Sequence, residues 1–197
     1  MMDKEKALQQ WRAKIHKYAP ISEKTWQTLV ALMRWQVVKK GTILLRHGQI
    51  ARDLHFIAQG ALRAYFTDAA GNYYNKNIFL DKDLACSTVS LLRSTPSNFT
   101  IECLEESYLL NVTYFDYRQL IEHCSDFKNY YIKYLEQHWI VEKEEREVAL
   151  VMENATERYL KLLQKHPRID QRIALHHLSS HLGITPTQLS RIRKKIQ

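Results

Sequence analysis

The sequence has few cysteines and no long apolar run. Three cysteines occur among 197 residues, Cys86, Cys103 and Cys124, and their wide spacing is unlike the close pairs of a metal site. An odd, dispersed set also argues against a disulfide framework, so we interpret all three as buried thiols. No stretch reaches the roughly 18 apolar residues that a membrane span needs. The N-terminal segment is charged and has no apolar signal region, so we expect a cytoplasmic protein that contacts no membrane.

The sequence also lacks the common catalytic motifs. It contains no G-x-S-x-G, H-E-x-x-H, P-loop or dinucleotide-binding fingerprint. The glutamates between residues 142 and 147 are interpreted as a solvated helix face rather than as paired catalytic acids. His176, His177 and His181 have a spacing that a metal ion could use, but we expect them to line the surface. The sequence therefore predicts no catalytic residue, no metal ligand and a protein that is not an enzyme.

Basic residues are concentrated near the C-terminus. The net charge of the chain is +8. From Ala155 onward nine basic residues stand against two acidic ones, which gives +7 and leaves +1 for residues 1–154. A basic unit joined to a neutral body is typical of a protein that binds a polyanion with one end. On charge alone, a solvated surface with a solubilising tail is the alternative.

A glycine-rich segment in the first half predicts β structure. Four of the five glycines lie between residues 41 and 71, where turn residues separate short apolar runs. In this segment TDAAGNYY predicts a hairpin that is turned by Asp68 and Gly71. FTIECL and SYLLNV predict two further strands, linked by Glu105 and Glu106. We therefore expect an antiparallel jelly-roll or barrel from about Trp35 to Val112.

Helical patterns flank the predicted barrel. ISEKTWQTLVALMRW has apolar residues at helical spacing, with Ser22 as N-cap, and FDYRQLIEH predicts a short helix after the barrel. Residues 126–152 contain neither glycine nor proline and predict one helix of about 40 Å. Its apolar stripe is too long for such a barrel to cover, so we expect a second copy to pack against it. The residues predicted for this dimer contact are Tyr131, Leu135, Trp139 and Met152.

The alternative for residues 126–152 is a helix that packs only against its own chain and has a polar middle. ENATERYLKLLQKHP then begins a new helix that ends at Pro167.

The segment LHHLSSHLGITPTQLSRI predicts two helices joined by a tight turn. Gly183 permits a left-handed turn, Thr185 suits an N-cap and Pro186 suits the first helical position. Ser179 is small where the two helices must cross. The inward-facing residues are Leu175, Leu178 and Leu182 on the first helix, and Leu189, Ile192 and Ile196 on the second. This pattern predicts a helix-turn-helix, with an ordinary helical hairpin as the alternative.

The outward face of the second helix has side chains suited to DNA. Thr187, Gln188 and Arg191 are the predicted base-reading residues, because Gln pairs with adenine, Arg with guanine and Thr with the thymine methyl group. A second set is predicted to contact phosphate: Thr185, Ser190, Arg193, Lys194 and Lys195.

The order of these parts resembles the Crp/Fnr superfamily of bacterial transcription regulators over nearly the whole chain. The most specific segments are GxxLLRxGxxARxLxFIxxGxLRxYFxDxxGN, from Gly41 to Asn72, and ATERYLKLLQKHP with IALHHLSSHLGITPTQLSRIRK. Both look like the short regulators of Bacteroidetes-type genomes. The resemblance implies an α+β fold with a cyclic-nucleotide-binding-like barrel, a long dimer helix and a C-terminal helix-turn-helix. It also implies a homodimer on a pseudo-palindromic double-stranded DNA site.

The barrel departs from the cyclic AMP branch of that family. The resemblance places Cys86 and Ser87 where that branch has a Gly-Glu pair, and Ser97 and Asn98 where it has Arg-Ser. Both charged anchors of the nucleotide are then missing, and a buried phosphate without its arginine is costly. We therefore expect no tight binding of cyclic AMP or cyclic GMP. Cys86, Ser87, Ser97 and Asn98 form a possible pocket for an unknown small-molecule effector, or the barrel has no ligand.

Other departures concern cofactors and the end of the sequence. Residues 1–85 contain no cysteine for an iron–sulfur cluster, and we do not expect haem at His16, His47 or His55. Many family members continue into a β wing that touches the DNA backbone, whereas this sequence ends at Gln197, so we expect weaker nonspecific affinity. The Arg-Glu pair found early in the family's recognition helix is replaced by Pro186 and Thr187, so a different target sequence is expected.

The sequence predicts three parts: a sensor domain (1–124), a dimerisation helix (125–153) and a helix-turn-helix domain (154–197). The predicted function is a dimeric DNA-binding regulator of the Crp/Fnr type without a bound cofactor. The alternative is a ligand-binding or protein-interaction module whose helix-turn-helix has little affinity for DNA.

Overall fold

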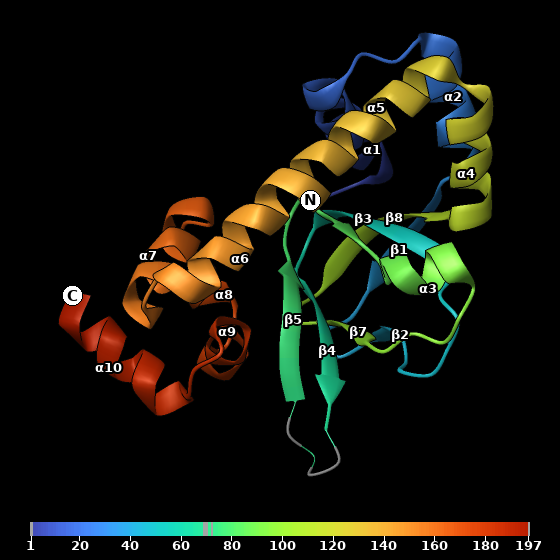
Figure 1. The fold of residues 1–197 in the computed structure, drawn as a ribbon. Coiled ribbons are helices and arrows are strands. Elements are labelled where there is room, and N and C mark those ends of the chain that lie inside the picture. Colours follow the sequence, from blue (N-terminus) through green and yellow to red (C-terminus); the bar gives the residue numbers. More distant parts are fainter. Residues whose placement is uncertain (1, 69–70, 72, 197) are drawn as a thin grey trace.

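A computed structural model of the chain describes residues 2–68, 71 and 73–196. It has antiparallel sheets at its centre, helices on one side of them and a separate group of helices beyond (Figure 1). The helices and strands before the long central helix are α1 (Lys4–Tyr18), α2 (Glu23–Leu32), β1 (Arg34–Val38), β2 (Ile43–Leu45), β3 (Asp53–Gln59), β4 (Leu62–Thr67), β5 (Tyr73–Phe79), β6 (Leu84–Ala85), α3 (Thr88–Arg93), β7 (Thr100–Cys103), β8 (Ser107–Thr113) and α4 (Tyr114–His123).

The strands form two four-stranded antiparallel sheets. Their orders are β1-β8-β3-β6 and β2-β7-β4-β5, so neighbours in each sheet come from distant parts of the chain. This confirms the predicted antiparallel barrel. β7 and β8 are consecutive but belong to different sheets, and the segment containing Glu105 and Glu106 carries the chain from one sheet to the other.

The predicted hairpin is present, since β4 pairs with β5 in an antiparallel register. The amide of Gly71 donates to the carbonyl of Asp68, and Gly71 has a φ of 83° that suits glycine. Residues 69, 70 and 72 of the predicted TDAAGNYY turn lie outside the described residues.

The outer face of one sheet is covered by the N-terminal helices. The ring of Trp11 in α1 stacks on Phe56 of β3, with 5.1 Å between centroids. α2 begins at the predicted N-cap, where Ser22 Oγ accepts a hydrogen bond from the Thr25 amide. α4 follows β8 directly and adds its buried Tyr117 to the same core. This core therefore joins the sheets, α1, α2 and α4 in one body.

The predicted long helix is continuous but not uniform. It consists of α5 (Ser125–Leu135), a π-helical segment η1 (Glu136–Val141) and α6 (Glu142–Met152). A π turn adds a residue and rotates the helix beyond it, so one 3-4 spacing does not describe a single face along the whole length. The predicted stripe is therefore corrected in its middle. There His138 bonds to Tyr18 of α1, and Glu142 bonds to Lys165 in the C-terminal helices of the same chain.

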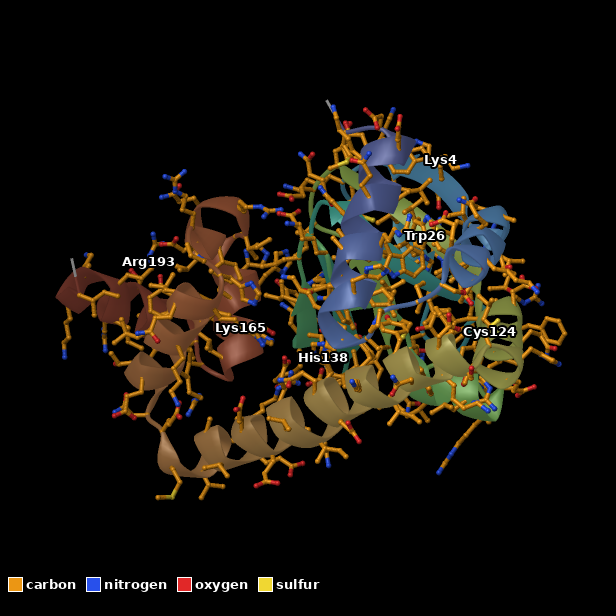
Figure 2. All side chains as sticks on the ribbon, turned by 90° about the horizontal axis from the view of Figure 1, so that it is seen from above. Lys4, Trp26, Cys124, His138, Lys165 and Arg193 are labelled. Carbon is orange, nitrogen blue, oxygen red and sulfur yellow. The ribbon has the colours of Figure 1, made fainter. Side chains whose placement is uncertain are left out.

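The C-terminal helices form a second small core. They are α7 (Ala155–Lys165), α8 (Ile169–Arg172), α9 (Leu175–Leu182) and α10 (Pro186–Ile196). α7 begins with a capping box, in which Asn154 and Glu157 bond to each other's backbone amides. Figure 2 shows the long helix along one side of the molecule, with the barrel and the C-terminal helices both lying on the same side of it.

Candidate nucleic-acid interface and sensor pocket

The turn between α9 and α10 has the predicted geometry. Gly183 adopts a left-handed conformation with a φ of 69°. Thr185 Oγ1 accepts a hydrogen bond from the Gln188 amide at 3.1 Å, and Pro186 is the first residue of α10. Ser179 is 1% exposed, as the close crossing of the two helices requires. The two helices are thus fixed in a tight, uncharged junction.

The inward face of α10 packs into the second core. Leu189 and Ile192 are buried against Leu178 and Leu182 of α9. Ile196, which was expected on the same face, is 39% exposed, because the last turn of α10 extends past the end of that core.

The opposite face of α10 is open to solvent. All three predicted base-reading residues, Thr187, Gln188 and Arg191, are exposed. Of the predicted phosphate-binding residues, Thr185, Lys194 and Lys195 are exposed and Ser190 is half-buried. This face therefore combines amide, hydroxyl and guanidinium groups with free ammonium groups.

Arg193 differs from the other cations of α10. It is half-buried, and its guanidinium group lies 3.4 Å from Asp170 Oδ2. Asp170 also accepts a weak hydrogen bond from Tyr159 Oη at 3.4 Å. Arg193 is therefore paired with Asp170 within the C-terminal helices, and its contact with phosphate stays a prediction.

Several other cations of this unit are also paired. Lys161 binds Glu153, Lys165 binds Glu142, and Arg172 binds both Asp81 and Glu105. Arg158 donates to the carbonyls of Glu153 and Leu182. Among the described residues, the basic side chains of this unit left without such a partner are Arg168, Arg191, Lys194 and Lys195. Three of these four are on α10, so the unpaired positive charge is concentrated there.

Two of the histidines of α9 do not line the surface as expected. His177 Nδ1 lies 3.1 Å from Arg63 Nη1 of β4, and the buried Nδ1 of His181 has no hydrogen-bond partner. Burial, together with Arg63, lowers the pKa of His177 to about 4. Burial and then Arg146 lower the pKa of His181 to about 4. Both side chains are therefore neutral at pH 7, and α9 faces the barrel rather than solvent.

The four predicted pocket residues do not converge on one site. Ser97 Oγ lies 2.8 Å from Ser87 Oγ, and both side chains are buried. The Cys86 thiol contacts Thr88 Oγ1 at 3.4 Å, and burial raises its pKa. Asn98 is exposed. Only Ser87 and Ser97 are brought together, and Ser97 Oγ also accepts a hydrogen bond from the Phe99 amide.

A lysine that the sequence patterns did not single out lies next to this region. Lys76 of β5 places its Nζ 4.3 Å from the centroid of the Phe99 ring, and burial, followed by Arg146, lowers its pKa. Lys76 lies at the register shift between β4 and β5, between Asn75 and Asn77, and no turn or spacing signal in the sequence marks that position.

The barrel contains a cavity of about 170 Å³, whose polar lining comes from five residues: Gln49, Arg52, Asp53, His55 and Ser87. His55 is buried inside the barrel, and its Nδ1 lies 2.7 Å from Asn111 Oδ1. Burial lowers the pKa of His55, so the imidazole is neutral. The cavity is small and polar, and of the four residues predicted for the pocket only Ser87 reaches it.

Residues 35–124 match the profile of the cyclic nucleotide-binding domain family. The match covers the barrel, from the second residue of β1 to the end of α4. A search of curated protein sequences finds no match to the chain. Solved structures resemble almost the whole chain at low sequence identity, and therefore show the fold of the cyclic nucleotide-binding domain together with the helices that follow it.

Three of these structures resemble most of this chain. FixK2 from Bradyrhizobium japonicum is 16% identical, with a TM-score of 0.67 over 83% of this chain and 84% of that one. The c-di-GMP responsive global regulator CLP from Xanthomonas campestris is 15% identical, with a TM-score of 0.64 over 89% and 92%. The catabolite activator protein from Thermus thermophilus is 19% identical, with a TM-score of 0.54 over 89% and 84%. The chain thus shares the fold of these three proteins, from the barrel through the helices that follow it.

The long helix joins the cyclic nucleotide-binding domain to the C-terminal helices. Tyr18 Oη and His138 Nε2 are 2.6 Å apart, and His138 Nδ1 lies 3.1 Å from Glu142. The other carboxylate oxygen of Glu142 bonds to Lys165 at 3.2 Å. Burial opposes ionisation of Glu142, but His138 and Lys165 outweigh it and lower its pKa. A chain of polar contacts thus runs from α1 through η1 and α6 to α7.

The residues predicted for a dimer contact differ in exposure. Tyr131 and Leu135 are half-buried, and the ring of Tyr131 lies 6.2 Å from that of Tyr117 in the same chain. Trp139 is 43% exposed and Met152 is 76% exposed. The second half of the long helix has further exposed apolar side chains: Ile140, Val141, Val148, Leu150 and Val151.

Among the residues that the structure describes, no helix is long and apolar enough to cross a membrane.

Proposed function

We propose that the chain is a dimeric DNA-binding transcriptional regulator of the Crp/Fnr type. In this proposal α9, Gly183 and α10 form a helix-turn-helix, and α10 is the helix that enters the major groove. The observation that carries the proposal is the outward face of α10, where Thr187, Gln188 and Arg191 are exposed beside unpaired lysines. This is the chemistry that reads base edges and neutralises phosphate.

The dimer contact is proposed for the second half of the long helix. α6 and the end of η1 expose seven large apolar side chains, and at 84% Val151 is the most exposed of them. In a single chain these side chains form an exposed apolar surface on the long helix. The same surface of a second copy packs against it in a symmetric dimer. Trp139 and Met152 are then part of the contact.

We propose that the barrel does not bind cyclic AMP in the usual manner. Ser87 and Ser97 form a hydrogen bond with each other. Both side chains are uncharged, so neither position has a charged group to hold a ribose or a phosphate. The nearby Lys76 lies on the ring of Phe99, where a nucleotide would have to displace it. An effector, if the barrel has one, is then a smaller molecule that suits a cavity of about 170 Å³.

Fluorescence anisotropy with duplex DNA tests the proposal. Titrations at two salt concentrations should give binding that weakens as salt rises, since cations on α10 displace counterions from the duplex. Arg191→Ala should weaken binding to a selected genomic site by about 1–3 kcal/mol. Arg168→Ala is the matched control, because Arg168 is also unpaired and exposed but lies outside α10.

Selection of bound genomic fragments supplies the site for this titration and reports its symmetry. A pseudo-palindrome with half-sites about one helical turn apart supports the dimer. Absence of binding at low salt contradicts the regulator and favours a ligand-binding or protein-interaction module.

A further inference from the structure

The turn between β1 and β2 lies close to the first turn of α9. The amide of Gly41 in this turn donates to the carbonyl of Cys103, the last residue of β7, at 2.7 Å. The neighbouring Glu102 binds Arg63 of β4 at 2.7 Å, and Nη1 of Arg63 lies 3.1 Å from Nδ1 of His177 in α9. Figure 1 shows α9 beside the sheet to which β5, β4 and β7 belong. Successive contacts across this sheet therefore connect the β1–β2 turn to α9.

Two lysines of the β1–β2 turn carry positive charge that no acidic group neutralises. Lys39 and Lys40 are both exposed. Within the described part of the chain, neither ammonium group forms an ion pair with a carboxylate. Burial, followed by Arg63 and His176, lowers the pKa of His177 to about 4, and Lys40 adds to this effect. The charge of Lys40 therefore acts on the first turn of α9.

The backbone that carries these lysines is held in place on both sides. The amide of Thr42 donates to the carbonyl of Lys39 at 3.1 Å, and the amide of Cys103 donates to the carbonyl of Thr42 at 2.9 Å. Gly41 has a φ of 80°, a left-handed conformation that glycine adopts without strain. Because the turn is already ordered, its lysines can bind a partner with little further loss of backbone entropy.

The carboxylates that the barrel presents near the C-terminal helices are already paired. Glu102 binds Arg63, whereas Asp81 and Glu105 bind Arg172. Such pairing reduces the repulsion between these carboxylates and an approaching polyanion. The unpaired charge of the β1–β2 turn is therefore positive and stands beside α9.

The first turn of α9 is where a helix-turn-helix meets the DNA backbone. In such motifs the first helix crosses the backbone while the second enters the major groove. α9 is the first helix of the proposed motif, and the exposed His176 belongs to its first turn. A phosphate strand that crosses this turn comes next to the β1–β2 turn of the barrel.

We propose that the β1–β2 turn is a second DNA-contacting surface, where Lys39 and Lys40 bind phosphates outside the base pairs that α10 reads. The inference rests on the proposed DNA-binding function. The contact is electrostatic and carries no base preference, since phosphate contacts do not distinguish one base pair from another. It extends the interface with DNA from the C-terminal helices onto the barrel.

Salt titrations of the full chain test the proposal. The double variant Lys39→Gln/Lys40→Gln is compared with the wild type by anisotropy, on a long duplex that contains the selected genomic site and its flanks. Each phosphate contact contributes about 0.9 to the slope of log K against log salt concentration, so the slope should fall by about 1.8 per chain. At low salt the affinity of the variant should be lower by about tenfold or more. Its preference for the selected site over a duplex with altered half-sites should not change, because phosphate contacts carry no sequence information.

Lys24→Gln/Lys128→Gln is the matched control. Both lysines are exposed, neither forms an ion pair in the part of the chain that the structure describes, and they lie on α2 and α5, far from α9 (Figure 1). This variant loses the same two charges and should keep the slope of the wild type. An unchanged slope in the turn variant, or an equal change in the control, overturns the contact at the turn while salt-dependent binding by the wild type leaves the DNA-binding function standing. No DNA binding by the wild type overturns both.

The length of the duplex gives a second readout. A duplex trimmed to the base pairs of the two half-sites lacks the phosphates assigned to Lys39 and Lys40. The wild type should bind this duplex more weakly than the long one, and the turn variant should bind it as well as the wild type does. An equal loss of affinity by the turn variant on both duplexes contradicts a contact outside the base pairs that α10 reads.

Discussion

His181 makes the stability of the protein depend on pH below about 6.5, as do His55, His166 and His177, whose pKa values are also lowered by burial. Its imidazole is enclosed between α9 and β5, and its Nδ1 is buried without a partner. The pKa is lowered from 6.5 to about 4, first by burial and then by Arg146. His166, on the segment after α7, opposes protonation as well, whereas the backbone at Asn75 and Lys76 favours it. The net effect is a folded state that resists protonation of His181.

The sign and size of the effect follow from this pKa. In the unfolded chain the imidazole takes up a proton as the pH falls below 6.5, but in the folded chain it does so only near pH 4. The stabilisation is therefore complete above pH 6.5 and is lost progressively as the pH falls towards 4. At pH 5 the free energy of unfolding is lower by about 2 kcal/mol than at pH 7 because of His181, since a pKa difference of one unit corresponds to about 1.4 kcal/mol.

Urea unfolding at pH 7 and at pH 5 measures the effect. The wild type should lose about 2 kcal/mol more unfolding free energy between these values than His181→Leu, which cannot be protonated. An equal loss in the wild type and in His181→Leu would refute the reasoning. His177 is half-exposed, so solvent screening makes its contribution smaller.

Four further outcomes are expected. Gly60→Ala should destabilise the chain by about 3 kcal/mol or more in thermal unfolding, because a Cβ there would lie 2.2 Å from Ser107 Oγ and the φ is +135°. Leu189→Ala should cost about 2–5 kcal/mol of the stability of the C-terminal helices, seen as faster hydrogen exchange in α9 and α10. Tyr18→Phe should cost about 1 kcal/mol in urea unfolding through loss of the bond to His138. Isothermal titration with cyclic AMP should give no micromolar binding, and a saturable micromolar isotherm would contradict the proposed properties of the barrel.

Much of the fold could be predicted because local signals agreed with the final structure. Ser22, Thr185 and Pro186 mark helix starts in the sequence, and each lies at the start that it predicts. The hairpin between β4 and β5 follows from its turn residues. These features depend on a few neighbouring residues and on little else.

Features that depend on distant residues could not be read from the sequence. The π segment η1 has no sequence signature, although the bonds of His138 to Tyr18 and Glu142 hold it in place. Arg172 was counted among the basic residues of the C-terminal segment, but its carboxylate partners come from the barrel. Arg193 was predicted to contact phosphate, and it lies 3.4 Å from Asp170. Charge counting gives the total in a segment and does not show which charges are already paired.

The predicted effector residues illustrate the same limit. Ser87 and Ser97 were placed by resemblance to a motif whose charged members are absent here, and they bond to each other instead. The cavity is lined by Gln49, Arg52 and His55, which come from β3 and from the loop before it. A motif comparison finds the positions that a family uses, and it does not show which side chains line the cavity of a chain that lacks those residues.

The strand order has a consequence for how the protein is made on the ribosome. β1 has β8 as its neighbour, and the register pairs Val38 with Ser107. β3 also needs β8, so one whole sheet lacks its central strand until residues 107–113 have been synthesised. Non-local pairing of this kind is slow and exposes apolar strands in the meantime. The nascent chain therefore leaves β1 and β3 without their partner strand until β8 emerges, and substitutions that weaken β8 should reduce the yield of soluble protein more than its final stability suggests.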